Sequence, residues 1–384
     1  MSSAVKVPLL RLSYSDAEVR ELQDELAAIL RSNYLTMASR VKEFERLFAG
    51  FCGTRFALGT NSGTSALEIP LRALRVAGGS VVMPSNTYMA TPIAAVKAGA
   101  KVIFTDCEAD NLQMDPDDLD RKIRDDTRAV LLVHIGGIIS PRLEEIQRIC
   151  ARRGVPLVED AAHAHGAEYR DRRAGSFGEA AGFSFYPTKV LTTAEGGMMT
   201  TDREDLYQLG TVFREHGKAD HGFNVHTEIG DNWRFSEIHA ALGIQQMRKA
   251  DSILAERRRL AALYDRLLDT VPEIRPLRIP AHVRSAYYKY IVFLPAHLSR
   301  DRLKSRLKDE FGVMLTGEVY SDPCHSQPVF TRQPELVANA AGDRFPATET
   351  VCRQHACLPL YPGLRDEEAA YVVQSLKQVL VTWN

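Results

Sequence analysis

One lysine of this sequence stands where amine chemistry is possible. Lys189 follows the apolar run 182–185 and precedes a turn rich in threonine and glycine at 192–197. A protonated lysine is a poor nucleophile, so enzymes that condense it with a carbonyl compound hold it partly buried, which lowers its pKa. The placement indicates a Schiff-base lysine, whereas the alternative for any single lysine is an ordinary surface residue. The neighbouring motifs have to decide between the two.

Two further segments match the needs of a phosphorylated pyridine aldehyde, pyridoxal phosphate (PLP). Residues 62–65 are small or hydroxyl-bearing and stand at a predicted helix start, where free N–H groups and the helix dipole favour a phosphate. Asp160 ends an apolar strand, and a carboxylate beside the pyridine nitrogen keeps the ring protonated, which makes it an electron sink. His163 could hydrogen-bond the phenolic oxygen. The alternatives are a simple helix cap and a metal site of Asp160, His163 and His165, which lacks further ligands at recognisable spacing.

Two other segments could complete such a site. Tyr88 follows a predicted strand end and could lie flat on the cofactor ring, although aromatic residues usually just fill a core. Asn232 and Arg234 lie in a loop that stops at a predicted helix cap, and their side chains could reach phosphate or carboxylate groups. The alternative for this loop is simple solvation.

The elements that must position these residues alternate along the chain. A capping box at Ser15–Glu18 opens an amphipathic helix, and a second helix is predicted at 41–51. Strands then alternate with helices, which predicts a mainly parallel sheet covered on both faces, with sites at the carboxyl ends of its strands. The strands are predicted at 56–60, 81–83, 101–104, 129–134, 156–159 and 197–201, with helices at 91–98, 116–124, 143–153 and 203–216.

The second half of the chain predicts a smaller domain. A long polar loop runs to 231, and a helix from 236 to about 268 is expected to break near Ala250 and Asp251. Beyond it lie a predicted strand at 287–294 and helices at 300–311 and 366–380. We therefore predict a large domain at 1–250 and a small C-terminal domain at 251–384.

Composition excludes several classes of protein. The 384 residues have a net charge of -1, which gives no electrostatic reason to expect a nucleic acid or an anionic membrane as partner. No signal peptide and no apolar run of membrane-spanning length is present. The six cysteines form no CxxC pair, so we expect them reduced, and we expect a cytoplasmic protein without a metal.

Together the motifs resemble the DegT/StrS group of sugar aminotransferases, which are PLP enzymes of fold type I. The resemblance runs from about residue 8 to the final helix. It implies an α/β fold with a large mainly parallel-sheet domain and a smaller C-terminal α+β domain. The motifs are SGTSAL, PSNTY, EDAAHAHG, SFYPTKxLTTAEGG, GDNWRFSEIHAALG and CLPLYPGL.

The same resemblance implies roles for individual residues. Lys189 would anchor the cofactor through a Schiff base and carry the proton between cofactor and substrate. Asp160 would pair with the pyridine nitrogen, His163 would contact the phenolic oxygen, and Tyr88 would stack on the ring.

The phosphate of the cofactor would be bound from two chains. Gly63, Thr64 and Ser184 match phosphate-contacting positions of the family, and Asn232 matches one that reaches the phosphate from the neighbouring subunit. The resemblance therefore implies a homodimer with shared active sites.

Three stretches depart from the family pattern. Met37-Ala38-Ser39 stands where a Gly-Pro turn is common, and Val190 replaces a frequent Asn beside the lysine. Residues 136–140 likewise differ from the usual Gly-Gln-Pro-like turn. We expect these stretches to border the sugar pocket, so they put the substrate in doubt and not the cofactor.

The expected function is a transamination in two halves, in which PLP takes the amine of glutamate or another amino acid and the pyridoxamine form (PMP) aminates a keto sugar. The form of 189–197 resembles family members acting on nucleotide-linked 4-keto-6-deoxy sugars. A keto-cyclitol substrate remains an alternative. Two others are a PLP-dependent sugar dehydratase, whose relatives carry histidine in place of the lysine, and a non-catalytic regulatory relative.

Overall fold

A seven-stranded sheet forms the centre of the molecule. The structure, a computed structural model, describes residues 5–12, 14–220 and 224–383. The order of the strands is β1-β9-β8-β5-β4-β2-β3, in which β9 is antiparallel to both of its neighbours and the other pairs are parallel. The strands are β1 (Phe56–Thr60), β2 (Ser80–Pro84), β3 (Lys101–Thr105), β4 (Thr127–Val133), β5 (Leu157–Asp160), β8 (Ala180–Ser184) and β9 (Gly197–Thr201).

Alternation along the strands explains why helices cover both faces of this sheet. In β2, Val81 and Met83 belong to one apolar cluster and Val82 to another, because successive side chains point to opposite faces. Helices α3 and α4 pack into the first cluster, and α2, α5 and α6 into the second. The predicted parallel sheet between two helical layers is confirmed. These helices are α2 (Ser39–Cys52), α3 (Gly63–Ala73), α4 (Ala90–Lys97), α5 (Pro116–Lys122) and α6 (Leu143–Arg153).

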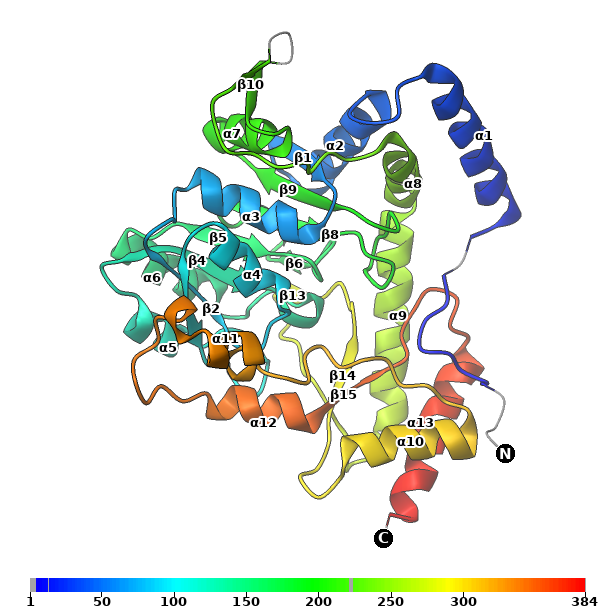
Figure 1. Cartoon of the computed structure of the whole chain (residues 1–384). Coiled ribbons are helices and arrows are strands. Elements are labelled where there is room, and N and C mark those ends of the chain that lie inside the picture. The colour runs from blue at the N-terminus through cyan, green and yellow to red at the C-terminus, as the bar shows by residue number, and fades with distance from the viewer. Residues whose placement is uncertain (1–4, 13, 221–223, 384) are drawn as a thin grey trace.

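A second apolar core lies in the C-terminal part, and we propose to assign it to a small domain at 251–384. It joins a three-stranded sheet of order β12-β14-β15 to three helices, and Val7 near the N-terminus packs into it as well. Figure 1 shows the other two helices, α10 and α13, beside the long α9. The elements are α9 (Ala250–Leu268), β12 (Arg275–Pro276), β14 (Tyr290–Phe293), α10 (Arg300–Phe311), β15 (His355–Leu358) and α13 (Asp366–Val381).

The helix ends lie where the sequence signals predict them, whereas one predicted loop contains strands. The capping box at Ser15 and Glu18 begins α1 (Asp16–Ser32), and the expected break separates α8 (Glu237–Arg248) from α9 at Lys249. The polar loop after α7 (Glu204–Arg214), by contrast, contains a hairpin of β10 (Lys218–Asp220) and β11 (Val225–His226). Strands of two or three residues are too short to show an alternating pattern. The same holds for β6 (Glu168–Tyr169), β7 (Arg172–Arg173) and β13 (Val283–Arg284).

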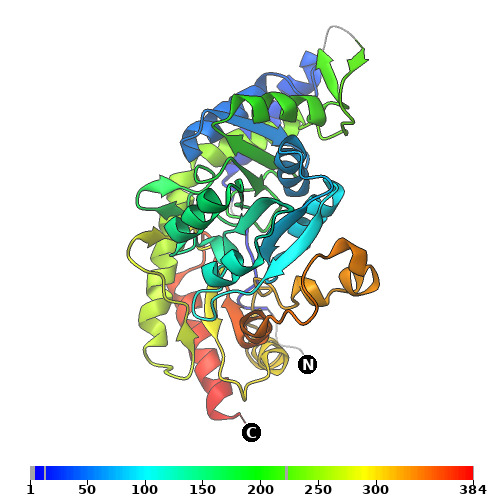
Figure 2. The same cartoon turned by 90° about the vertical axis from the view of Figure 1, so that its left-hand side faces the viewer.

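The C-terminal part returns to the open edge of the large sheet. Val337 pairs with Val102 of the edge strand β3, and Asn339 exchanges two hydrogen bonds with the backbone of Phe104, at 2.8 and 2.9 Å. Figure 2 shows this segment, with α11 (Pro328–Arg332) and α12 (Pro346–Gln354), along that edge. The covered edge cannot pair with another chain.

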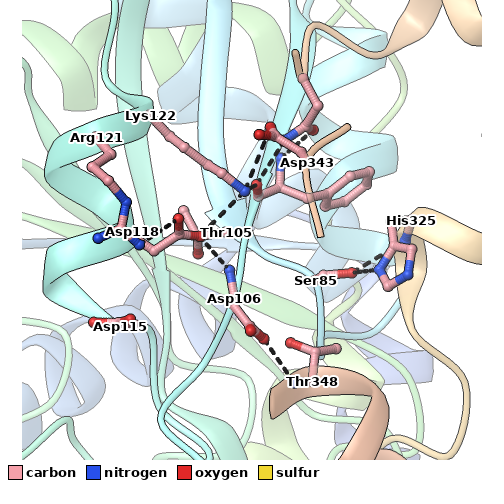
Figure 3. Close-up of polar contacts among 12 residues, drawn as sticks. Ser85, Thr105, Asp106, Asp115, Asp118, Arg121, Lys122, His325, Asp343 and Thr348 are labelled. Carbon is pink, nitrogen blue, oxygen red and sulfur yellow. Dashed lines mark hydrogen bonds and ion pairs between the residues drawn. The ribbon is translucent and has the colours of Figure 1, made fainter. Parts of the chain in front are cut away.

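Charged residues reinforce this closure of the edge (Figure 3). The carboxylate of Asp106 accepts hydrogen bonds from the N–H groups of Ala347 and Thr348 at the start of α12. Lys122 donates to the carbonyl of Phe104 at 2.9 Å and lies 3.6 Å from Asp343 of the returning segment.

Among the helices that the structure describes, none is both long enough and apolar enough to cross a membrane.

Candidate active site

Strand direction brings the predicted site residues to one edge of the sheet. β1, β8, β5 and β2 run the same way, so their carboxyl ends face the same side. Ser62, Ser184, Asp160 and Ser85 stand at or just after these four ends. Such an edge is where open α/β sheets bind ligands.

The turn that carries Lys189 is held by its own threonines. Thr192 donates its hydroxyl hydrogen to the carbonyl of Phe185 at 2.9 Å, and the N–H of Thr193 donates to the same carbonyl at 3.0 Å. Lys189 itself is partly buried, and desolvation lowers its pKa from 10.5 to about 8. The charge of Asp160 opposes this shift and that of Lys289 adds to it. A larger fraction of this amine than of an ordinary lysine is therefore neutral and able to accept a proton near neutral pH.

Asp160 is buried and its two oxygens are both engaged. Thr91 donates its hydroxyl hydrogen to one oxygen at 2.6 Å, and the N–H of Ala162 donates to the other at 3.1 Å. Burial raises the pKa of Asp160, against the effect of these two hydrogen bonds and of the charge on Lys189. The hydroxyl of Thr91 is in turn 2.7 Å from that of Thr87, so a buried pair of threonines orients the carboxylate.

His163 lies between two tyrosines of the C-terminal part. Its ring stacks on Tyr288 at 4.0 Å between centroids and on Tyr320 at 5.7 Å, and its Nδ1 is 3.4 Å from the Tyr320 hydroxyl. Burial and the charges of Lys189 and Lys289 hold the pKa of His163 well below its usual value. The imidazole is therefore neutral, which leaves one ring nitrogen to accept and one to donate.

His165, the third member of the alternative metal set, lies in an aromatic core. Its ring centroid is 5.2 to 6.2 Å from those of Phe48, Phe183 and Phe185, and burial lowers its pKa to about 3. Within the described part of the chain, no three His, Cys, Asp or Glu side chains gather as metal ligands would.

The predicted phosphate residues meet at the start of α3. The hydroxyl of Ser62 caps the helix by accepting the N–H of Ser65, and Gly63 lies so close to Ser184 that a Cβ on Gly63 would stand 2.7 Å from the Cβ of Ser184. Glycine is required here for that approach. Thr64 follows directly in the chain. The backbone N–H groups of the first turn, the residues Thr64 and Ser184 and the positive end of the helix dipole are therefore all found at the start of α3.

Tyr88 and Asn232 lie farther out. Tyr88 is 65% exposed. It follows Ser85, whose hydroxyl is 2.7 Å from the imidazole of His325 in the C-terminal part, as Figure 3 shows. Asn232 is exposed, and its carbonyl accepts a hydrogen bond from the side chain of Asn61, next to the helix cap. Arg234 already forms an ion pair with Glu215 at 2.7 Å.

The departures from the family pattern have structural accounts. Met37 adopts a φ of 56°, a left-handed conformation that glycine takes without strain. Gly137, at φ 83°, lets the backbone of Tyr288 approach. Ile138 and Ile139 are buried in the main core, and Val190, which is 4% exposed, lines a cavity with Lys189.

That cavity has a volume of about 320 Å³ and lies between the lysine turn, the N-terminal segment and the junction of α8 with α9. Its lining includes Tyr14, Lys189, Val190, Lys249 and Arg257.

Sequence reasoning missed four residues of this neighbourhood. Thr91, Tyr288, Lys289 and Tyr320 are brought to the site by long-range packing, and their positions follow no local motif. The one available signal was the pair Tyr288-Lys289 in a run otherwise typical of a buried strand, where a lysine is out of place.

The residues present fit PLP on the structure's own evidence. A helix start with a glycine pressed against a serine can receive a phosphate, a buried carboxylate can face a protonated pyridine nitrogen, and a lysine of lowered pKa lies at the same edge of the sheet. A neutral histidine can serve the phenolic oxygen. The chemistry of these donors is that of the predicted cofactor site.

Comparison with known proteins agrees with this fit. The sequence model of the DegT/DnrJ/EryC1/StrS aminotransferase family matches residues 16–377. The chain is similar to GDP-perosamine synthase of Caulobacter vibrioides, with 30% identity over 94% of this chain and 95% of that protein. It is also similar to dTDP-3-amino-3,4,6-trideoxy-alpha-D-glucose transaminase of Micromonospora megalomicea, with 28% identity over 95% and 96%.

Two solved structures superimpose on almost the whole chain. DesV of S. venezuelae, solved with a ketimine intermediate, has a TM-score of 0.89 and 31% identity, covering 98% of both chains. The PLP form of the putative sugar aminotransferase Spr1654 from Streptococcus pneumoniae has a TM-score of 0.86 and 25% identity, covering 99% of this chain and 98% of that one.

Proposed function

We propose, because the chain belongs to the DegT/DnrJ/EryC1/StrS aminotransferase family, that it moves an amino group from glutamate to a nucleotide-linked keto sugar. The chain is a PLP-dependent sugar aminotransferase of fold type I, as the sequence predicted. The donor, the link of the sugar to a nucleotide and the carbon that receives the amine are our proposals.

The names of two relatives support a nucleotide-linked substrate. One is named for a GDP-sugar and the other for a dTDP-sugar. The second name places the amine at C3, whereas the motif at 189–197 resembles members acting on 4-keto sugars. We therefore propose a 4-keto-6-deoxy sugar on the strength of that motif and leave the base of the nucleotide open.

One observation carries the proposed mechanism: the amine of Lys189 and the carboxylate of Asp160 meet at one edge of the sheet, and the pKa of the lysine is about 8. PLP, when bound, supplies an aldehyde that condenses with amines and a pyridinium ring that withdraws electrons from the carbon losing its proton. We propose that Lys189 takes that proton at its Nζ and returns it to the neighbouring carbon. Asp160, held by Thr91 and Ala162, would keep the ring nitrogen protonated.

The remaining residues would bind and orient. We propose that Gly63, Thr64 and Ser184 hold the phosphate at the start of α3. His163, neutral and fixed between two tyrosine rings, would hydrogen-bond the phenolic oxygen. Tyr88 would cover the exposed ring face.

The sequence left three other functions open. A keto-cyclitol aminotransferase needs the same machinery and differs only in the acceptor. A sugar dehydratase of this fold would have a histidine at position 189, where this chain has a lysine. A non-catalytic relative has no use for a desolvated lysine near a buried carboxylate, because burying such charged groups costs folding free energy.

A panel of acceptors tests the function. The purified protein with PLP and L-glutamate is given GDP-, dTDP- and UDP-linked 4-keto-6-deoxy sugars, 3-keto sugars and a keto-cyclitol, and products are read by mass spectrometry. We expect an amine on one nucleotide-linked 4-keto sugar. Amination of the cyclitol alone would identify a keto-cyclitol aminotransferase, and a deoxy-keto product without nitrogen would indicate a dehydratase.

We also propose a cytoplasmic homodimer with shared active sites. All six cysteines are buried free thiols, which suits a reducing compartment. Helix α1 lies at the outer edge of the molecule in Figure 1 and leaves Val19, Leu26 and Leu30 39 to 57% exposed, a stripe that a second copy could cover. In such a dimer Asn232 would reach the partner's phosphate site.

Mixed dimers test the sharing of sites. Lys189→Ala and Asn232→Ala are each expected to be poorly active, and a heterodimer of the two contains one site with both defects and one site with neither. Unfolding and refolding an equimolar mixture should therefore restore about a quarter of wild-type activity, because half of the dimers are mixed and each has one intact site. If Asn232 serves its own subunit, the mixture stays as inactive as its parts.

A further inference from the structure

A second lysine stands beside the first at the ring of Tyr288. The Nζ atoms of Lys189 and Lys289 are each 5.1 Å from the centroid of that ring, so they are at most about twice this distance apart. The ring itself is fixed, because it stacks on His163 and its hydroxyl is 3.2 Å from that of Thr188. Lys289 is therefore part of the wall of the site.

Lys289 has no counter-ion of its own. Within the described residues its Nζ forms no hydrogen bond and no ion pair. The neighbouring carboxylate of Glu318 is already paired with Lys304 at 2.9 Å and lies 3.7 Å from Arg300. Removing an ammonium group from water without a partner is unfavourable, and burial accordingly lowers the pKa of Lys289.

A third cation adds to this excess. Arg257 is 3% exposed and donates to the backbone carbonyls of Tyr287 and Leu360, and no carboxylate among the described residues pairs with it. Burial lowers the pKa of Arg257 to about 10. On this small-domain wall Arg257 and Lys289 thus have no carboxylate partner among the described residues, and Arg300 and Lys304 share Glu318. Such a wall favours an anionic guest.

We propose that Lys289 binds the α-carboxylate of the amino-acid donor, an inference that rests on the proposed transamination. The carboxylate of an amino acid is attached to the same carbon as the amine. When the amine lies at Lys189, hydrogen bonds of about 2.8 Å at each end place the carboxylate within the span between the two lysines. The phosphates of a nucleotide sugar are attached to a different ring carbon from the keto group and are farther from the reacting nitrogen.

The donor half-reaction tests this assignment without any sugar. The holoenzyme is mixed with L-glutamate in a stopped-flow instrument, and the loss of the visible PLP band is followed against glutamate concentration. We expect Lys289→Met to raise the half-saturating glutamate concentration by about 10–100-fold, the range for one charge-assisted hydrogen bond. Lys289→Arg, which keeps the charge, should stay within a few-fold of wild type.

Two further measurements separate binding from a general structural effect. Glutarate, which has carboxylates but no amine, should shift the visible spectrum of the wild-type holoenzyme and lose this binding in Lys289→Met. The matched control is Lys304→Met, which removes a nearby lysine that already has Glu318 as partner. It should shift the glutamate dependence less than Lys289→Met does, because the charge of Lys304 is already balanced by Glu318.

An unchanged glutamate dependence in Lys289→Met would overturn the proposal. So would a normal donor half-reaction with a weakened acceptor half, which would assign the charge to the sugar phosphates. If the Met variant does not fold, Lys289→Gln compared with Lys289→Arg gives the same decision. Because no acceptor is used, failure of every sugar in the panel would leave this result standing, and the two hypotheses fail separately.

Discussion

Lys189→Ala should lose the visible absorbance of the lysine-bound cofactor and its turnover together. The lowered pKa of about 8 makes this amine a better proton acceptor than an ordinary lysine, and its loss removes both the proposed covalent anchor and the proton carrier. Proton transfer by a positioned group contributes up to about 10⁴-fold to a rate, and we expect at least that loss here. Absorbance spectra of the protein with PLP and coupled detection of 2-oxoglutarate measure both effects.

Lys289→Ala is the matched control for this experiment. It removes a second lysine at the same distance from Tyr288 but leaves the proposed anchor, so the visible band should remain. A Lys189→Ala protein that still transaminates would remove the lysine from its role. Partial rescue by small primary amines would support it, because a free amine can replace the missing base.

Asp160→Asn should keep PLP bound and slow the reaction by at least about a thousandfold, or about 4 kcal/mol of transition-state stabilisation. The phosphate residues and Lys189 are untouched, so the cofactor keeps its main contacts. The neutral amide cannot hold the pyridine nitrogen in its protonated form, and an unprotonated ring withdraws electrons poorly. Single-turnover rates with glutamate, read at saturating PLP, measure the effect.

Thr91→Val is the companion variant for Asp160. It keeps the charge and removes the hydrogen bond of 2.6 Å that helps to hold the carboxylate ionised. Because that bond lowers the pKa of Asp160, its loss should raise the pKa and move the acid limb of the pH profile to higher pH, with a smaller loss of rate than in Asp160→Asn. Wild-type rates in Asp160→Asn would contradict the assigned role of this carboxylate.

The residues that the sequence could identify are those whose chemistry and position are local. Asp160 ends an apolar strand, Ser62 caps a helix and Lys189 lies in the turn that follows another apolar strand, and parallel strands bring such ends to one edge. The alternation of Val81, Val82 and Met83 between two apolar clusters is likewise a property of the backbone. These features need no knowledge of distant contacts.

The residues that the sequence could not identify depend on distant contacts. Tyr288 reaches His163 from 125 positions later in the chain and Tyr320 from 157, and nothing in their surroundings encodes a partner. Thr91 lies on a helix, where a hydroxyl ordinarily bonds its own backbone, and its partner Asp160 is 69 residues away. The hairpin after α7 could not be predicted for another reason, since its strands are too short to show an alternating apolar pattern.

The closed edge of the large sheet has a consequence for how the protein is made. Strand β3 is covered by Asn339, which is 235 residues later in the chain than Phe104. At a synthesis rate of about 5–20 residues per second, the ribosome needs roughly 12–47 s to produce the covering segment after the strand itself. Throughout that interval the nascent sheet offers unpaired N–H and C=O groups to neighbouring nascent chains. Overproduction therefore exposes this protein to aggregation during translation, in the same interval in which Asp160, Lys189 and Asn232 are synthesised.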